Sequence, residues 1–105
     1  MANKYRGEIH AEIGGKIFTL VLTLGALAEL EDAFGAEDLV ALTERFSSGR
    51  LKARDLTRII GAGLRGAGEP ISDDEVARLA VNDGAQGYVR IAAALIAATF
   101  GDEAA

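Results

Sequence analysis

Small or apolar residues alternate with polar ones at the start of the chain, a pattern typical of a β-strand with one wet face. The two sets are Gly7, Ile9, Ala11 and Ile13 against Arg6, Glu8, His10 and Glu12. Two glycines, Gly14 and Gly15, separate this run from a second one, KIFTLVLT over 16–23. Glycine supplies the positive φ that tight hairpin turns need. The pattern therefore predicts a β-hairpin over about residues 5–23.

After Thr23 the apolar spacing changes to three and four residues, which predicts helices. We expect Thr23 to cap a first helix that Gly35 ends. A second helix is expected over about 37–46 with Leu39, Leu42 and Phe46 inward, and a third over about 52–64. Gly61 and Gly63 weaken the third helix, so we expect them to permit close approach of another backbone.

The next helix has the clearest start in the chain. Ser72 and Glu75 are spaced as a capping box, and Ile71 and Val76 as a hydrophobic staple. We expect this helix to continue to Asn82, with Val76, Leu79 and Ala80 inward. Asp83 with Gln86 is then expected to begin the last helix, over about 85–100, which Gly101 ends.

These elements predict an α+β fold that is mainly helical, with the N-terminal β-hairpin packed on a bundle of about five α-helices. At 105 residues the chain is expected to form a single domain over 1–105. Its parts are the hairpin, a helical part over about 24–101 and a frayed tail over 102–105.

Composition then excludes several classes of function. Cysteine is absent, which removes disulfides and thiolate chemistry. His10 is the sole histidine, and we interpret it as a solvated strand residue. Asp73, Asp74 and Glu75 suit the first turn of a helix better than a metal site. The string GAGLRG over 61–66 ends a helix, whereas a dinucleotide fingerprint opens one. We therefore expect no enzyme activity, no cofactor and no metal.

The N-terminus lacks a signal-peptide pattern, and no run reaches the roughly 18 apolar residues of a membrane span. We therefore expect a cytoplasmic protein without a membrane partner.

The remaining candidate is a basic segment within a chain of net charge −5. Arg50, Arg54, Arg58 and Arg65 recur at spacings that place them on one side of a helix. One interpretation is a solvated surface that pairs with the protein's own acids. The other is a docking surface for an acidic or polar partner. Nucleic acid is a weaker third, because the chain is acidic overall and no aromatic residue lies among these arginines.

Three stretches together resemble a known family: LTLGALAELEDAFG (22–35), GRLKARDLTRIIGAGLRGAG (49–68) and ATFG (98–101). Their order and spacing are similar to those of the small tail protein of gene transfer agents, phage-like particles of alphaproteobacteria, a family grouped with phage tail assembly chaperones. The resemblance covers about residues 5–101.

The resemblance implies a non-enzymatic chaperone that keeps the tape-measure protein, or another tail protein, soluble during tail assembly. The alternative is a structural tail or tail-tube component of the particle. We place the protein-binding surface at Arg50, Arg54, Arg58 and Arg65, with Ile17 and Val21 on the second apolar face of the hairpin. The open hairpin edges leave a homo-oligomer as a further alternative.

Overall fold

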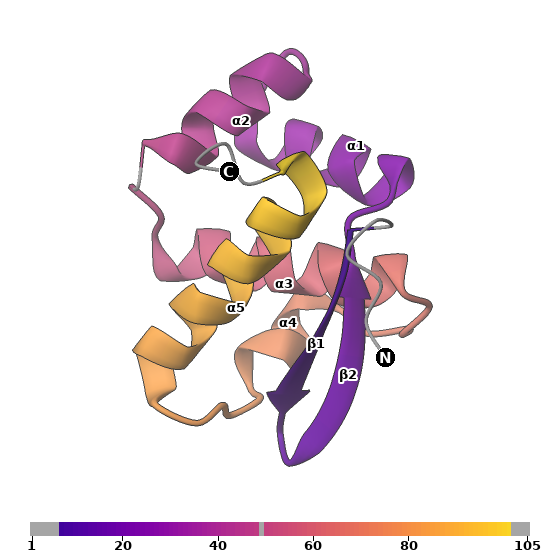
Figure 1. The fold of residues 1–105 in the computed structure, drawn as a ribbon, viewed down its shortest axis with the longest axis vertical. Coiled ribbons are helices and arrows are strands. Elements are labelled where there is room, and N and C mark those ends of the chain that lie inside the picture. The colour runs from indigo at the N-terminus through magenta and orange to yellow at the C-terminus, as the bar shows by residue number, and fades with distance from the viewer. Residues whose placement is uncertain (1–6, 49, 102–105) are drawn as a thin grey trace.

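An antiparallel hairpin followed by five helices forms the computed structural model, which describes residues 7–48 and 50–101 (Figure 1). The elements are β1 (Glu8–Ile13), β2 (Lys16–Val21), α1 (Leu24–Phe34), α2 (Leu39–Ser47), α3 (Ala53–Gly66), α4 (Asp73–Ala77) and α5 (Gly84–Phe100). The predicted α+β, mainly helical fold is confirmed. The predicted start of the hairpin at residues 5–6 and the predicted frayed tail at 102–105 lie outside the described residues.

The hairpin forms at the predicted turn. Gly14 and Gly15 have φ values of 61° and 82°, and β1 pairs with β2 in the register Ile13 opposite Lys16. Two positive φ values in a two-residue loop match the right-handed twist of the strands. Ile13 and Leu20 are fully buried on the inner face, whereas His10 and Ile17 are exposed on the outer one.

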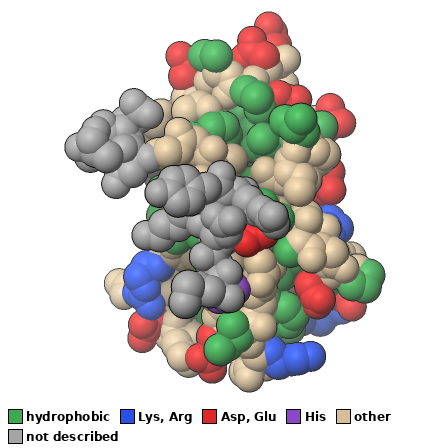
Figure 2. All heavy atoms as spheres, turned by 45° about the vertical axis from the view of Figure 1, so that its right-hand side comes forward, with side chains coloured by type: hydrophobic (Ala, Val, Ile, Leu, Met, Phe, Trp, Pro, Cys, Tyr) green, Lys and Arg blue, Asp and Glu red, His purple; other side chains and the backbone are tan. Residues whose placement is uncertain are grey.

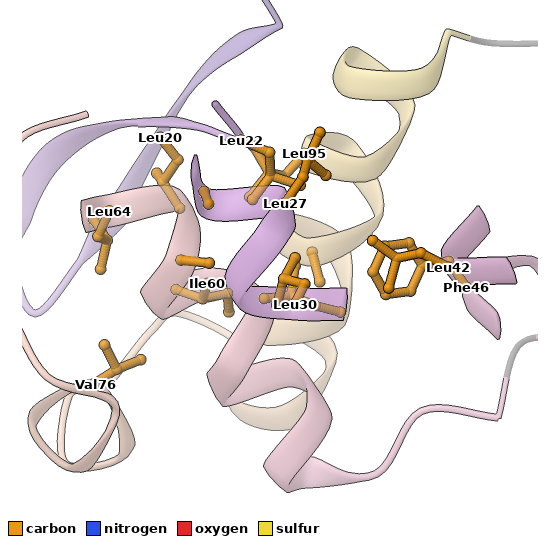
Figure 3. Packing of buried hydrophobic residues seen from close by; sticks show 14 of the residues in the cluster. Leu20, Leu22, Leu27, Leu30, Leu42, Phe46, Ile60, Leu64, Val76 and Leu95 are labelled. Atoms are coloured by element: carbon orange, nitrogen blue, oxygen red, sulfur yellow. The ribbon is translucent and has the colours of Figure 1, made fainter. Parts of the chain in front are cut away.

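Helix α3 is the central element of the fold and packs against β2, α1, α4 and α5. Its buried face includes Ile59, Ile60 and Leu64, each without exposed area. Figure 3 shows Leu64 and Ile60 of α3 within a cluster that also takes side chains from the hairpin, α1 and α5. The amphipathic pattern of this segment thus places α3 at the centre of the core.

Helix α2 joins this core through Leu42 and Phe46, both of which are buried. The ring of Phe46 contacts the ring of Phe34 edge-on at a centroid distance of 5.7 Å, and the ring of Phe100 at 6.2 Å. Edge-on contacts at such distances are favourable between aromatic rings. Phe46 therefore attaches α2 to the ends of both α1 and α5.

Three glycines of α3 allow close packing. A Cβ atom at Gly63 would lie 2.6 Å from Cδ2 of Leu95, and one at Gly66 would overlap the carbonyl oxygen of Val21. A Cβ atom at Gly61 would overlap the carboxylate of Asp73. The prediction that another backbone approaches Gly61 and Gly63 was wrong: side chains approach both of these residues, and the approaching backbone lies at Gly66.

The prediction for α2 was wrong at its start. Asp38 is the N-cap residue, and its carboxylate accepts the N–H of Ala41 at 2.9 Å. The helix therefore begins at Leu39. The Leu39 side chain, which was expected to point inward, points outward and is 40% exposed.

The prediction for α4 was wrong at its end. The helix stops at Ala77, and Ala80 is exposed because its carbonyl oxygen accepts the N–H of Gly14 at 2.7 Å. The Tyr88 hydroxyl also donates to the carbonyl oxygen of Leu79. These bonds to distant residues hold the segment in a non-helical conformation.

The expected cap of α5 is also absent. Asp83 adopts φ 70° and makes no side-chain cap. Its carboxylate instead accepts a hydrogen bond from Arg90 at 2.5 Å. An aspartate tolerates this left-handed conformation better than most residues do.

Candidate functional site

The four predicted arginines do not share one helix face. Helix α3 begins at Ala53, so Arg50 precedes the helix; the prediction that placed it on the same face was wrong. The helix starts there because the carboxylate of Asp55 accepts the N–H of Lys52 at 2.9 Å. An acceptor at this position satisfies an amide that has no partner within the helix.

Four basic side chains gather around the start of α3, and we call them the basic strip: Arg50, Lys52, Arg54 and Arg58. The first three are exposed, and none of the ion pairs among the described residues includes them. Arg58 is half-buried and donates to the carbonyl oxygen of Ala33 at 3.1 Å. Because Ala33 lies in the last turn of α1, this cation satisfies a free carbonyl at a negative helix end.

Arg65 is bonded within the chain and is separate from the basic strip. Its guanidinium donates to Glu29 of α1 at 2.6 Å, to Asp73 of α4 at 2.9 Å and to the carbonyl oxygen of Ile71 at 3.0 Å. The hydrogen bond to Glu29 and the charge of Asp73 raise the pKa of Arg65, against the opposing effect of burial. Arg65 therefore connects α3 to α1 and α4. This agrees with the interpretation in which the arginines pair with the protein's own acids.

Asp55 is the one charged residue among the buried side chains of the described chain, with 4% of its surface exposed. Its carboxylate lies 3.5 Å from the guanidinium of Arg45 on α2 and also accepts the N–H of Lys52. The ion pair of Asp55 could not be predicted from the sequence, because Arg45 lies on another helix, whereas its bond to Lys52 is a local cap. Asp55 therefore fixes the backbone at Lys52, where α3 and the basic strip begin.

An acidic region lies next to the basic strip. Residues 24–48, which contain α1 and α2, hold six acidic side chains and one basic side chain, Arg45. In Figure 2, acidic side chains gather at this end of the molecule with apolar ones among them. The exposed apolar residues include Leu24, 79% exposed, and Val40, 68% exposed. The molecule thus presents an acidic, partly apolar end and a basic strip.

The two hairpin candidates lie apart from the basic strip. Ile17 is 74% exposed on the outer face of β2, whereas Val21 is half-buried on the same face. The carbonyl of Val21 lies against Gly66, at the opposite end of α3 from Arg54. At 1.5 Å per residue, these two ends of the helix are about 18 Å apart. The six predicted residues therefore do not form one site.

No group of three or more His, Cys, Asp or Glu side chains among the described residues is placed to hold a metal ion. In residues 7–48 and 50–101, no helix combines the length and apolar character needed to cross a membrane.

Comparison with curated proteins and with solved structures finds no significant match in either set. A family model described as phage tail tube protein, GTA-gp10, matches residues 6–102. This match covers nearly all of the chain, including the three stretches on which the resemblance to a gene transfer agent tail protein was based. The chain belongs to the phage tail tube protein family GTA-gp10.

Proposed function

We propose that the protein is a structural component of the tail of a gene transfer agent and works by binding other tail proteins. The family match over residues 6–102 carries this proposal. The structure supports it with surfaces suited to contact between subunits: the exposed basic strip, the acidic end of the molecule and the exposed Ile17. We propose no enzyme activity and no cofactor for this role.

The proposal predicts that the protein remains in the finished particle. Mass spectrometry of purified particles would count its copies relative to another tail protein. We expect a fixed, multiple number of copies per tail. Abundance in assembling cells together with absence from purified particles would contradict the structural role.

The second candidate is an assembly chaperone for the tape-measure protein, and one observation favours it. The described residues hold a single two-stranded sheet, which offers little strand length for a continuous tube wall. Leu24 and Val40 are exposed within residues 24–48, a segment with six acidic side chains and one basic side chain. Net charge keeps a protein soluble while it presents apolar surface. Co-expression with the tape-measure protein would test this candidate. A chaperone would keep that protein soluble and would co-purify with it.

The basic strip is our proposed contact surface in either role. Arg54→Glu reverses an exposed charge on it, and Lys16→Glu makes the same change on the hairpin as a matched control. We expect the first variant alone to weaken binding to the tail partner at low salt, and added salt to reduce the difference. Equal binding by both variants would assign the contact to another surface.

A further inference from the structure

An open cleft runs along the outer edge of β1 and carries an inference beyond the proposed function. Four consecutive β1 residues, from Ile9 to Glu12, line one side of it. The other side consists of Val81, Asn82, Gly87, Arg90, Ile91 and Ala94, from α5 and the segment before it. Consecutive strand residues point to opposite faces of a sheet. A cleft that touches all four therefore lies at the edge of the strand, and no β2 residue lines it.

The backbone of β1 presents to this cleft hydrogen-bonding groups that β2 does not use. Ile13 and Lys16 flank the two-residue turn and form a hydrogen-bonded pair, so the ladder alternates from there. The N–H and C=O groups of His10 and Glu12 therefore point away from β2. Among the backbone bonds of the described residues, none from another segment reaches them.

The opposite edge of the sheet is less accessible. At one end of β2, a Cβ atom added at Gly66 would overlap the Val21 carbonyl oxygen, so α3 closes that end of the strand. An exposed strand edge is a template for an additional strand. In this sheet, the β1 edge is the one that has space beside it for an additional strand.

The walls of the cleft specify what such a strand would carry. Half-buried Ile91 and Val81, with exposed Ala94, offer apolar contact to side chains on the inner face. On the outer face, the added strand would lie beside the exposed carboxylate of Glu12. Arg90, the cation on the α5 side of the cleft, is paired with Asp83, so Glu12 leaves the cleft with a net negative charge. Opposite charges on neighbouring strands attract.

We propose that this cleft binds an extended peptide segment of a partner protein, which adds to β1 as a third strand. The segment carries apolar side chains at alternate positions and lysine or arginine between them. Backbone hydrogen bonds to His10 and Glu12 hold it, and the alternation matches the apolar wall and the acidic outer face. This cleft is a different surface from the basic strip. Peptide binding at the cleft does not depend on whether the protein is a structural component of the tail.

A synthetic peptide tests this on the purified full-length protein. The probe is an alternating Val–Lys peptide of six residues, matched to the six residues of β1, with blocked ends. With about 1 mM peptide, we expect amide shifts in the NMR spectrum at His10, Glu12 and Ile91. A peptide of the same composition with the three valines together is the control. No shifts, shifts at another surface, or equal binding of the control would overturn the proposal.

Backbone methylation of the peptide tests strand addition without altering the protein. Only alternate amides of an added strand face β1. N-methylation of the Lys amides should abolish binding if the added strand is antiparallel, and of the Val amides if it is parallel. The other set should be tolerated in each case. Equal effects of the two sets would overturn strand addition.

The charge of the partner is tested at Glu12. Glu12→Lys should weaken binding of the Val–Lys peptide about fivefold and strengthen binding of a Val–Glu peptide. An unchanged preference would overturn the assigned chemistry. If the protein alone is a dimer with slowly exchanging His10 and Glu12 amides that the peptide does not displace, a second copy occupies the edge and the proposal is wrong.

Discussion

Gly63 of α3 lies so close to Leu95 of α5 that a Cβ atom at position 63 would be 2.6 Å from Cδ2 of Leu95. It would also lie 3.2 Å from Cβ of Leu20. Leu20 and Leu95 are both fully buried, so neither side chain has free space into which it can turn. The absence of a side chain at this position sets the spacing of α3, α5 and the hairpin.

Gly63→Ala should therefore destabilise the protein although alanine favours helix. Overpacking of this kind costs about 1–3 kcal/mol, more than the roughly 1 kcal/mol gained in helix propensity. Gly25→Ala is the matched control, because Gly25 is exposed in α1 and its Cβ would meet only Oγ1 of Thr23 at 3.8 Å. Urea unfolding should show opposite shifts for the two variants. Stabilisation by both would contradict the close packing at Gly63.

Replacing Asp55 should lower the stability of the protein more than replacing an exposed acid does. Asp55→Ala leaves the N–H of Lys52 without its acceptor and Arg45 without its partner, at an expected cost of about 1–2 kcal/mol in the free energy of unfolding. Asp55→Asn keeps an oxygen acceptor and should cost less. Asp74→Ala removes an exposed acid of α4 and should change stability by under about 0.5 kcal/mol. Denaturant unfolding that ranks Asp74→Ala beside Asp55→Ala would count against this role.

Arg65 should couple energetically to Glu29. Arg65→Met keeps much of the apolar stem but loses three hydrogen bonds, for which we expect a loss of about 1–2 kcal/mol. Glu29→Gln should cost less, because the Glu29 side chain is 48% exposed. A double-mutant cycle should give a coupling energy of about 0.2–1 kcal/mol that falls with added salt. Strict additivity of the two changes would show that the pair contributes nothing.

Glu75 should make the stability of the protein depend on pH in the acid range. The N–H of Ser72 and then its hydroxyl lower the pKa of Glu75 below the ordinary glutamate value. The folded pKa is lower than the unfolded one, so this contribution is present above the unfolded pKa. It is lost as pH falls through the folded pKa. An NMR titration of the carboxylate should place its midpoint below that of a free glutamate.

Glu75→Gln is the corresponding variant for unfolding experiments. Because glutamine does not titrate, the difference in stability between wild type and variant should shrink as pH falls through the folded pKa. A difference that stays constant across the acid range would show that the capping carboxylate is not responsible.

Local chemistry explains why much of the fold could be predicted from the sequence. The Gly14–Gly15 turn, the cap by Thr23 and the capping box of Ser72 and Glu75 act over three residues or fewer. One wrong prediction, the start of α2, has a local cause in the cap by Asp38, whereas the wrong prediction at Ala80 depends on a distant partner. Ala80 is turned outward because its carbonyl bonds Gly14, 66 positions earlier in the numbering.

The same distinction applies to the candidate surfaces. The basic character of the segment around α3 is visible in the sequence, but the partners of Arg65 lie on α1 and α4. The open hairpin edges were expected from the sequence, but the cleft beside β1 could not be predicted, because its two walls come from segments far apart in the chain. The residue pattern of one wall gives no indication of which segment forms the other wall.

The separation of those walls along the chain has a consequence for synthesis. Because β1 ends at Ile13 and α5 begins at Gly84, a nascent chain exposes the β1 edge before the opposite wall has been made. Contacts of such long sequence separation form late in folding. A partner that requires both walls will discriminate against truncated or half-made chains. Recognition at the cleft would therefore report that the chain has been made as far as α5.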